Sequence, residues 1–335
     1  CALPILPMAG LGKRMRPHTL TVAKPLIPVA GKPVVQWLVE DIIRVCGQKV
    51  DEIAYVVGRF GKENEDRLLK IAADLGAKGS LHYQDEPLGT AHAILCAAEA
   101  LNGPVVVAFA DTLFRADFTL DGSKDGIIWV KKVDDPSAFG VVKTDAAGTI
   151  TDFVEKPKEF VSDLAIIGIY YFRDGDNLKK ELQFLIDNNI RGNNEFQLTD
   201  ALENMKKKGT RFAAGTVEEW LDCGNKNVTV YTNQRVLENN KEKMKLPASL
   251  KNENSIVIPP CYIGENVILR NSVIGPHVSI GEGSVIESSV ISDSILQQKV
   301  SIQNASIARS MIGNFAEYKG KASDLSIGDY TQITA

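Results

Sequence analysis

The first 110 residues alternate short apolar runs with amphipathic stretches, a pattern typical of βαβ units. Apolar runs predict strands at 2–8, 52–57, 81–84 and 105–110. Apolar residues at helical spacing predict the intervening helices at 33–45, 63–75 and 90–101. The expected fold class is therefore α/β, with a Rossmann-like, doubly wound and mostly parallel sheet.

Beyond Asp111 the pattern becomes richer in strands. Further strands are predicted at 126–131, 139–143 and 165–172, and a turn at 145–148. Helical spacing continues at 177–186 and 198–207, and a more polar helix is expected at 227–238. These elements complete an expected domain of residues 1–240, followed by a charged linker at 241–254.

From about Ile256 the sequence changes character. Aliphatic residues recur every five or six positions, at Ile263, Ile268, Ile274, Ile280, Ile286, Ile291, Leu296, Ile302, Ile307 and Ile312. This period fits neither an α-helix nor a hairpin, but it suits a coil that buries one aliphatic residue per face by stacking on the next coil. The repeat resembles that of the hexapeptide-repeat left-handed β-helix, which is therefore expected at 255–335.

Length, charge and cysteine content restrict the possible functions. A chain of 335 residues is long enough for a large domain and a smaller one. No apolar stretch approaches membrane-spanning length, and the N-terminal segment resembles a strand more than a signal peptide, so a cytoplasmic location is expected. A net charge of −4 offers no general attraction for nucleic acid. The five cysteines contain no CxxC pair, which predicts reduced thiols and no zinc site.

A glycine loop follows the first predicted strand, in the run Met8-Ala-Gly-Leu-Gly-Lys-Arg-Met. The backbone N–H groups of Ala9, Gly10, Leu11 and Gly12 can approach phosphate oxygens, and Arg14 and Lys24 add positive charge. The loop matches neither the GxGxxG fingerprint nor a Walker A motif. It is interpreted as a polyphosphate-binding loop, with a tight turn bearing solvated basic residues as the alternative.

Two carboxylates are candidate metal ligands. Asp111 ends an apolar strand, and side chains at the carboxyl ends of strands face the crevice of an open α/β sheet; its alternative role is to cap the following turn. Asp222 comes from a distant part of the chain, in Trp220-Leu-Asp-Cys-Gly. Two carboxylates opposite a basic loop suit a hard cation that bridges phosphate oxygens, such as Mg²⁺.

The glycine loop and the segment around Lys24 resemble the signature GxGTRLxPxTxxxPKPL of the sugar nucleotidyltransferases. This is the family of glucose-1-phosphate thymidylyltransferase and bacterial UDP-glucose pyrophosphorylase. Lys13 and Ala23 depart from the usual threonine and proline, but Arg14 and Lys24 are present. The resemblance implies that Arg14 binds the triphosphate and the departing pyrophosphate, that Lys24 lies against the reacting phosphates, and that Asp111 and Asp222 bind Mg²⁺.

Further motifs follow in the family's order, so the resemblance covers roughly residues 2–240. Gln84 and Gly89 are similar to the base-recognition segment, where an amide can pair with the polar edge of a pyrimidine and glycine lets the base lie against the backbone. Taken alone, these two residues could equally be a strand end and a helix cap.

The sugar-binding segments are also recognisable by resemblance. Gly140 is expected to offer its backbone to a hexose hydroxyl, Glu155 to accept hydrogen bonds from sugar hydroxyls, and Lys156 to hold the sugar phosphate. Gly168 lies in the next sugar-contacting strand, where Ile167 replaces the usual Asn or Thr. This departure affects the choice of sugar rather than the reaction.

The resemblance implies transfer of a nucleotidyl group from a nucleoside triphosphate, dTTP or UTP favoured, to a sugar 1-phosphate, glucose 1-phosphate favoured. Such a reaction depends on positioning and charge neutralisation and needs no covalent nucleophile. The four histidines (His18, His82, His92 and His277) accordingly have no companion at catalytic spacing and are expected to be structural.

Several alternatives stay open at this stage. The chain could combine nucleotidyl transfer with acyl transfer on the β-helix, or it could be a mannose-1-phosphate guanylyltransferase. A catalytically silent nucleotide-sugar sensor is disfavoured, because all five charged anchors are present. The repeats are expected to associate subunits into a homo-oligomer, with no nucleic acid or membrane partner.

Overall fold

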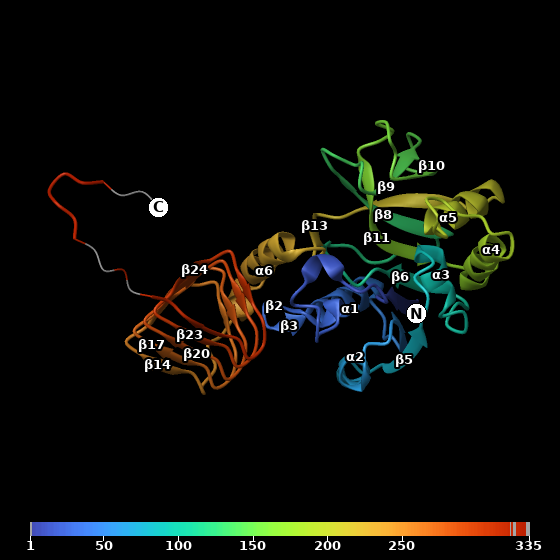
Figure 1. Cartoon of the computed structure of the whole chain (residues 1–335). Coiled ribbons are helices and arrows are strands. Elements are labelled where there is room, and N and C mark those ends of the chain that lie inside the picture. Colours follow the sequence, from blue (N-terminus) through green and yellow to red (C-terminus); the bar gives the residue numbers. More distant parts are fainter. Residues whose placement is uncertain (1, 322, 324–325, 333–335) are drawn as a thin grey trace. The chain divides into compact units, whose positions relative to one another are not determined.

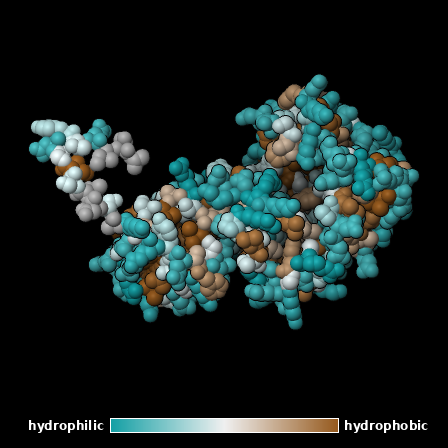
Figure 2. Space-filling view, in the orientation of Figure 1, coloured by the Kyte–Doolittle hydropathy of each residue, from teal (hydrophilic) through white to brown (hydrophobic). Residues whose placement is uncertain are grey.

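The computed structural model describes residues 2–321, 323 and 326–332. Two compact units divide the chain: the larger holds the chain up to Ile27 and from Lys32 to Val228, and the smaller holds Pro28–Gly31 and the chain from Thr229 onwards. Hydrophilic residues cover most of the face shown in Figure 2. Among the described residues, no helix is long and apolar enough to cross a membrane.

A nine-stranded sheet lies at the centre of the larger unit (Figure 1). Its parallel part has the order β6-β1-β4-β5, formed by Val105–Ala108, Leu3–Pro7, Glu52–Val57 and Lys78–Tyr83. The long strand β11 (Leu164–Phe172) runs antiparallel to β6, to β8 (Gly126–Lys132) and to β9 (Gly140–Thr144). The sheet is therefore mixed, and its parallel part is the βαβ region of the sequence.

Strands β4 and β6 are nearly continuous apolar runs, as expected of parallel strands covered on both faces of a sheet. The edge strand β5 differs, because none of its residues is buried. Five of the six residues of β4 are buried, as are all four of β6. The helices of this part are α1 (Val34–Cys46), α2 (Lys62–Asp74) and α3 (Thr90–Leu95). Helix α3 ends before the predicted boundary, because residues 97–100 form tight turns with hydrogen bonds to residues three positions earlier. Helices α4 (Gly175–Asp187) and α5 (Leu198–Lys207) complete this core.

Six short strands outside the β-helix were not predicted from the sequence: β2 (Pro28–Val29), β3 (Lys32–Pro33), β7 (Thr112–Arg115), β10 (Ile150–Glu155), β12 (Phe212–Thr216) and β13 (Glu219–Asp222). Strands β2 and β3 have only two residues each, β10 follows β9 after a short turn, and β7, β12 and β13 pair with partners distant in the chain. Strands β7 and β13 form a small separate sheet, β10 pairs with β9, and β12 lies parallel to β8.

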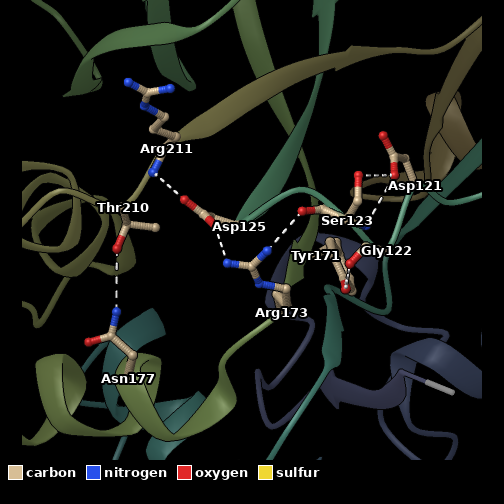
Figure 3. A network of polar contacts seen from close by, with 9 residues as sticks. All are labelled: Asp121, Gly122, Ser123, Asp125, Tyr171, Arg173, Asn177, Thr210 and Arg211. Atoms are coloured by element: carbon tan, nitrogen blue, oxygen red, sulfur yellow. Dashed lines mark hydrogen bonds and ion pairs between the residues drawn. The ribbon is translucent and has the colours of Figure 1, made fainter.

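A polar network holds the loop before β8 against the ends of β11 and β12 (Figure 3). The guanidinium of Arg173 lies 2.5 Å from Oδ1 of Asp125 and donates to the carbonyl oxygen of Ser123 at 2.9 Å. The other oxygen of Asp125 accepts from the backbone N–H of Arg211 at 3.1 Å. Three chain segments are thereby fixed at the edge of the sheet opposite the carboxyl ends of β1 and β6.

The smaller unit contains the left-handed parallel β-helix that the repeat predicts. Its three faces are parallel sheets with the orders β14-β17-β20-β23-β26, β15-β18-β21-β24 and β16-β19-β22-β25. The strands are two or three residues long, at Lys251–Glu253, Ile256–Val257, Tyr262–Ile263, Ile268–Arg270, Val273–Ile274, Ser279–Ile280, Val285–Glu287, Val290–Ser292, Ile295–Leu296, Ser301–Gln303, Ser306–Ala308, Met311–Ile312 and Glu317–Lys319 for β14 to β26. Residues 322, 324–325 and 333–335 of the predicted range lie outside the described residues.

Register along one face gives the length of a coil. Leu269 lies opposite Ile286, and Ile286 lies opposite Ile302, so successive coils take 17 and 16 residues. Most of the predicted aliphatic residues are buried in the interior, and Ile307 and Ile312 are partly buried against it. Leu269, fully buried, occupies the position assigned to Ile268. Side chains alternate in direction along a strand, so Ile268, one position before the inward-facing Leu269, faces outward.

Helix α6 (Lys226–Asn239) carries buried polar side chains. Hydrogen bonds from one of them attach the helix to the β-helix. Asn233 is fully buried. Its Oδ1 accepts from the backbone N–H of Ala30 at 2.9 Å and from the hydroxyl of Ser279 at 2.6 Å, and its Nδ2 donates to the carbonyl oxygen of His277 at 3.2 Å. One side chain thus joins three segments of the smaller unit.

His277 has no companion at catalytic spacing in the sequence, but in the fold it contacts two carboxylates. Its Nε2 lies 2.6 Å from Oε1 of Glu238 on α6, and its Nδ1 lies 3.0 Å from Oδ1 of Asp293. The sequence reasoning missed this contact because the three residues are separated by a whole coil or more. The expectation of a structural role for His277 agrees with this position.

Replacement of Asn233 by alanine is expected to destabilise the smaller unit by about 1–3 kcal/mol, because it leaves a buried N–H and a buried hydroxyl without a partner. Thermal and urea unfolding of Asn233→Ala measures this, with Asn227→Ala, an exposed position on the same helix, as the control. Equal stability of the two variants would show that the Asn233 hydrogen bonds contribute nothing.

Candidate active site

A cavity of about 430 Å³ lies at the carboxyl ends of β1, β5 and β6. This is the edge where open α/β sheets bind ligands. Eight of the predicted residues line it: Ala9, Gly10, Gly12, Arg14, Lys24, Gln84, Gly89 and Asp111. The cavity therefore brings together residues from four separate parts of the chain. Leu11 is not among the lining residues, and its side chain is 67% exposed.

The glycine loop has the backbone that a phosphate-binding loop requires. Gly12 has φ +58°, and a Cβ there would lie 3.0 Å from Thr19 and 3.1 Å from Lys24. The hydroxyl of Thr19 donates to the carbonyl oxygen of Gly12 at 2.9 Å and holds this turn. A Cβ on Gly10 would have no atom within 4 Å, so the backbone there is open to a ligand.

Charged side chains of both signs meet at one end of the cavity. Nζ of Lys24 lies 2.6 Å from Oδ2 of Asp111, and the Lys24 side chain is only 13% exposed. Burial raises the pKa of Asp222 from its ordinary value, and the neighbouring Asp111 carboxylate raises it further, whereas Lys24 and Arg14 lower it. The four side chains therefore form one electrostatic cluster.

The small sheet of β7 and β13 explains how Asp222 reaches Asp111. Asp222 pairs with Thr112 in this antiparallel sheet, and the N–H of Cys223 donates to the carbonyl oxygen of Asp111 at 2.9 Å. Gly224 completes the arrangement, because a Cβ there would lie 2.8 Å from Oδ2 of Asp222 and 3.3 Å from the guanidinium of Arg14. A residue with a side chain at position 224 would therefore displace Asp222 from its place in the charge cluster.

The predicted base-recognition residues contact each other. Nε2 of Gln84 donates to the carbonyl oxygen of Gly89 at 3.2 Å. Gly89 has φ +121°, and a Cβ there would lie 2.5 Å from the carbonyl oxygen of Phe196, so only glycine fits. The backbone of 88–91 is in turn held by hydrogen bonds with Phe196.

The predicted sugar-binding residues form a second group, outside the lining of the cavity. Gly140 pairs with Glu155 across β9 and β10. Oε2 of Glu155 accepts from the hydroxyl of Thr199 at 3.2 Å, and Oε1 lies 3.7 Å from Nζ of Lys156. Lys156 has φ +42°, a strained value for a residue with a side chain. Strain of this kind is often found at ligand sites.

Two contacts connect the sugar group with the cavity end of the sheet. The rings of Phe139, beside Gly140, and Trp220, beside the Asp222 strand end, pack edge to face with centroids 4.9 Å apart. Gly168 accepts at its carbonyl oxygen from the N–H of Phe109, a cavity residue, at 3.0 Å.

Sequence reasoning missed four polar residues. Lys13, Thr90 and Glu195 line the cavity, and Thr199 holds Glu155. Lys13 stood inside the recognised loop and could have been included. Glu195 and Thr199 lie on a segment with no recognised motif, and only the tertiary fold brings them to the site.

Asp111 and Asp222 are the candidate ligands for a divalent cation. Within the described part of the chain, no group of three or more His, Cys, Asp or Glu side chains could hold a metal ion. Asp111 and Asp222 nevertheless fit Mg²⁺, which is often bound by one or two carboxylates together with substrate phosphates. Burial and, secondly, the charge of Asp111 raise the pKa of Asp222, and a bound cation would relieve the repulsion between the two carboxylates.

Comparison with known proteins identifies the family of the chain. The sequence profile described as Nucleotidyl transferase matches residues 3–239. A low-salt glycan biosynthesis nucleotidyltransferase of Haloferax volcanii is 29% identical over 98% of this chain and 99% of its own length. Glucose-1-phosphate thymidylyltransferase of Streptomyces griseus is 28% identical over 96% of both chains.

Among solved structures, UDP-glucose pyrophosphorylase complexed with UDP-glucose is similar, with a TM-score of 0.59 and 25% identity over 71% of this chain and 99% of its own. Because the profile spans more than half of the sequence, the chain belongs to the nucleotidyl transferase family.

Proposed function

We propose that this protein transfers a nucleotidyl group from a nucleoside triphosphate, UTP or dTTP, to a sugar 1-phosphate, with glucose 1-phosphate favoured. The observation that carries the proposal is a cavity lined by the glycine loop, Arg14, Lys24 and Asp111, with Asp222 electrostatically coupled to these three side chains. An uncharged or singly charged ligand would not need two cationic side chains and two carboxylates in one place.

In this reaction an oxygen of the sugar phosphate attacks the α-phosphorus of the triphosphate. The bond between the α-phosphorus and the α,β-bridging oxygen breaks, and pyrophosphate leaves with the electron pair. Two anions must approach each other, so positioning and charge neutralisation supply most of the catalysis. Within the cavity, Arg14 is assigned to the triphosphate and the leaving pyrophosphate, and Lys24 to the reacting phosphates.

The roles proposed for the other residues are those that the family resemblance implies. The N–H groups of the glycine loop, residues 9–12, bind phosphate oxygens, and Gln84 and Gly89 bind the base. Lys156 binds the sugar phosphate, while Glu155, Gly140 and Gly168 bind the sugar. Asp111 and Asp222 would hold Mg²⁺, which would supply charge neutralisation at the phosphates.

The β-helix is assigned to subunit association in a homo-oligomer. Its coils are short, and the outward faces of Ile256 and Val290 are 61% and 51% exposed. We place the enzyme in the cytoplasm, where nucleoside triphosphates are available and where the free thiols of Cys46, Cys96, Cys223 and Cys261 stay reduced. Cys1 lies outside the described residues.

A substrate matrix tests the proposed reaction. Each of UTP, dTTP, CTP and GTP is paired with glucose, mannose, galactose and glucosamine 1-phosphates in the presence of Mg²⁺, and pyrophosphate release is measured. We expect the highest rate with glucose 1-phosphate and UTP or dTTP. The fastest rate with GTP and mannose 1-phosphate would instead support a guanylyltransferase, and no pyrophosphate with any pair would refute nucleotidyl transfer.

Asp111→Ala and Asp222→Ala are each expected to lower kcat by about 100-fold or more, because each removes a charge partner of the transition state. Circular dichroism establishes whether the fold is retained. Asp187→Ala, at an exposed position at the end of α4, is the matched control and should keep full activity. Retention of more than about a tenth of kcat by either site variant would contradict the assignment.

Truncation before Asn252 is expected to lower the melting temperature, because Asn233 loses its hydrogen bonds with Ser279 and His277. It is also expected to change the oligomeric state, because the β-helix assigned to subunit association is removed. Light scattering and thermal unfolding measure both. The residues assigned to the chemistry all precede the truncation, so transferase activity of the folded fraction should persist. An unchanged oligomer and melting temperature would refute the association role.

The same proteins address a second activity on the β-helix. Incubation of the full-length protein with acetyl-CoA and an amino-sugar phosphate should give no acetylated product. Acetyl transfer that disappears on truncation would establish the bifunctional alternative.

A further inference from the structure

The amide of Gln84 has a fixed orientation at the edge of the cavity. Its Nε2 lies 3.2 Å from the carbonyl oxygen of Gly89 and 3.1 Å from Nδ1 of His92. A carbonyl oxygen only accepts hydrogen bonds, so the atom facing Gly89 must be the NH₂ group. The second N–H of that group then points to His92.

His92 can hold this N–H only when its Nδ1 is unprotonated. Burial lowers the pKa of His92, while the charge of Glu86 and a backbone hydrogen bond with Glu86 raise it less strongly. The net shift is downward, so the ring is neutral at neutral pH and one ring nitrogen is a lone-pair acceptor. His92 lies in α3, three residues after Gly89, and its position is therefore fixed relative to the carbonyl that holds the other N–H.

With both N–H groups engaged, the amide offers a ligand only its oxygen. Within the described residues, Oε1 of Gln84 makes no hydrogen bond, and Gln84 lines the cavity. A base that meets Gln84 therefore meets an acceptor. Uracil and thymine carry an N–H at ring position 3 between two carbonyls, and guanine carries one at position 1. Cytosine and adenine present a lone pair at the corresponding positions and would face acceptor against acceptor.

We propose that His92 is a positioning residue that fixes the Gln84 amide and thereby selects triphosphates whose base has an N–H on its pairing edge. The proposal rests on the proposed function, because it assigns the cavity to a nucleotide. It goes beyond the expectation that His92 is structural, since it makes base choice depend on one acceptor atom.

Removing that atom has a specific consequence. Without Nδ1 the second N–H of Gln84 loses its partner, so the amide, still held at Gly89 through its other N–H, can tilt and offer the freed N–H to the ring lone pair of cytosine. An asparagine at position 92 places its Oδ1 close to where Nδ1 of histidine lies and restores the acceptor, whereas leucine has nearly the shape of asparagine without any polar atom. Asparagine and leucine therefore separate the effect of the acceptor from the effect of volume.

The test compares wild type, His92→Asn, His92→Leu and His92→Ala, with His82→Ala as the control. His82 contacts Ser80 on β5 and does not line the cavity. The ratio of kcat/KM for UTP to that for CTP is measured with glucose 1-phosphate and Mg²⁺. In parallel, the ratio of Kd values for the two triphosphates is measured by calorimetry without sugar phosphate, and melting temperatures establish folding.

We expect the preference for UTP to fall by about 10-fold or more in His92→Leu and His92→Ala. It should stay within about threefold of wild type in His92→Asn and His82→Ala. An unchanged preference in His92→Leu, or an equal loss in His92→Leu and His92→Asn, overturns the proposal. Should His92→Ala not fold, the asparagine and leucine pair gives the same decision.

The two measurements distinguish this proposal from the proposed function. Absence of pyrophosphate with every triphosphate refutes nucleotidyl transfer, but the ratio of Kd values still shows whether His92 sets the base preference of the cavity. Normal transfer with a base preference that ignores the acceptor at position 92 refutes the positioning role alone.

Discussion

Repulsion between phosphate groups is the constraint that organises the larger unit. A cavity that brings two phosphorylated substrates together must gather positive charge and fix its position. Lys24 is held by Asp111 at 2.6 Å, and the partly buried Asp222 experiences Asp111, Lys24 and Arg14 together. The small sheet of β7 and β13, the positive φ of Gly12 and the missing side chain of Gly224 all serve to keep these groups in contact.

The parallel part of the sheet and the β-helix could be predicted because their signals are local. Strand β4 has the bounds that its apolar run indicates, and the interior of the β-helix follows the aliphatic repeat apart from Ile268 and Leu269. Strands β7 and β13 could not be predicted, since each has only four residues and its partner lies more than 100 residues away. Their existence depends on long-range pairing that no local pattern expresses.

The site shows the same division. Residues within recognised motifs, such as Arg14 and Gln84, reach the cavity, whereas Glu195 and Thr199 have no motif and were missed. His92 and His277 were judged by spacing along the chain, yet each has partners in the fold: Gln84 for His92, and Glu238 with Asp293 for His277. Spacing in sequence detects clusters on one helix or strand, but it does not detect contacts between elements.

The fate of oxygen atoms tests the central claim most directly. Sugar 1-phosphate labelled with ¹⁸O in its phosphoryl oxygens is incubated with the protein, Mg²⁺ and unlabelled triphosphate, and the products are analysed by ³¹P NMR and mass spectrometry. The account predicts that all the label is found in the nucleotide-sugar, with one labelled oxygen bridging its two phosphorus atoms, and that the pyrophosphate is unlabelled. Labelled orthophosphate or labelled pyrophosphate would contradict attack by the sugar phosphate on the α-phosphorus.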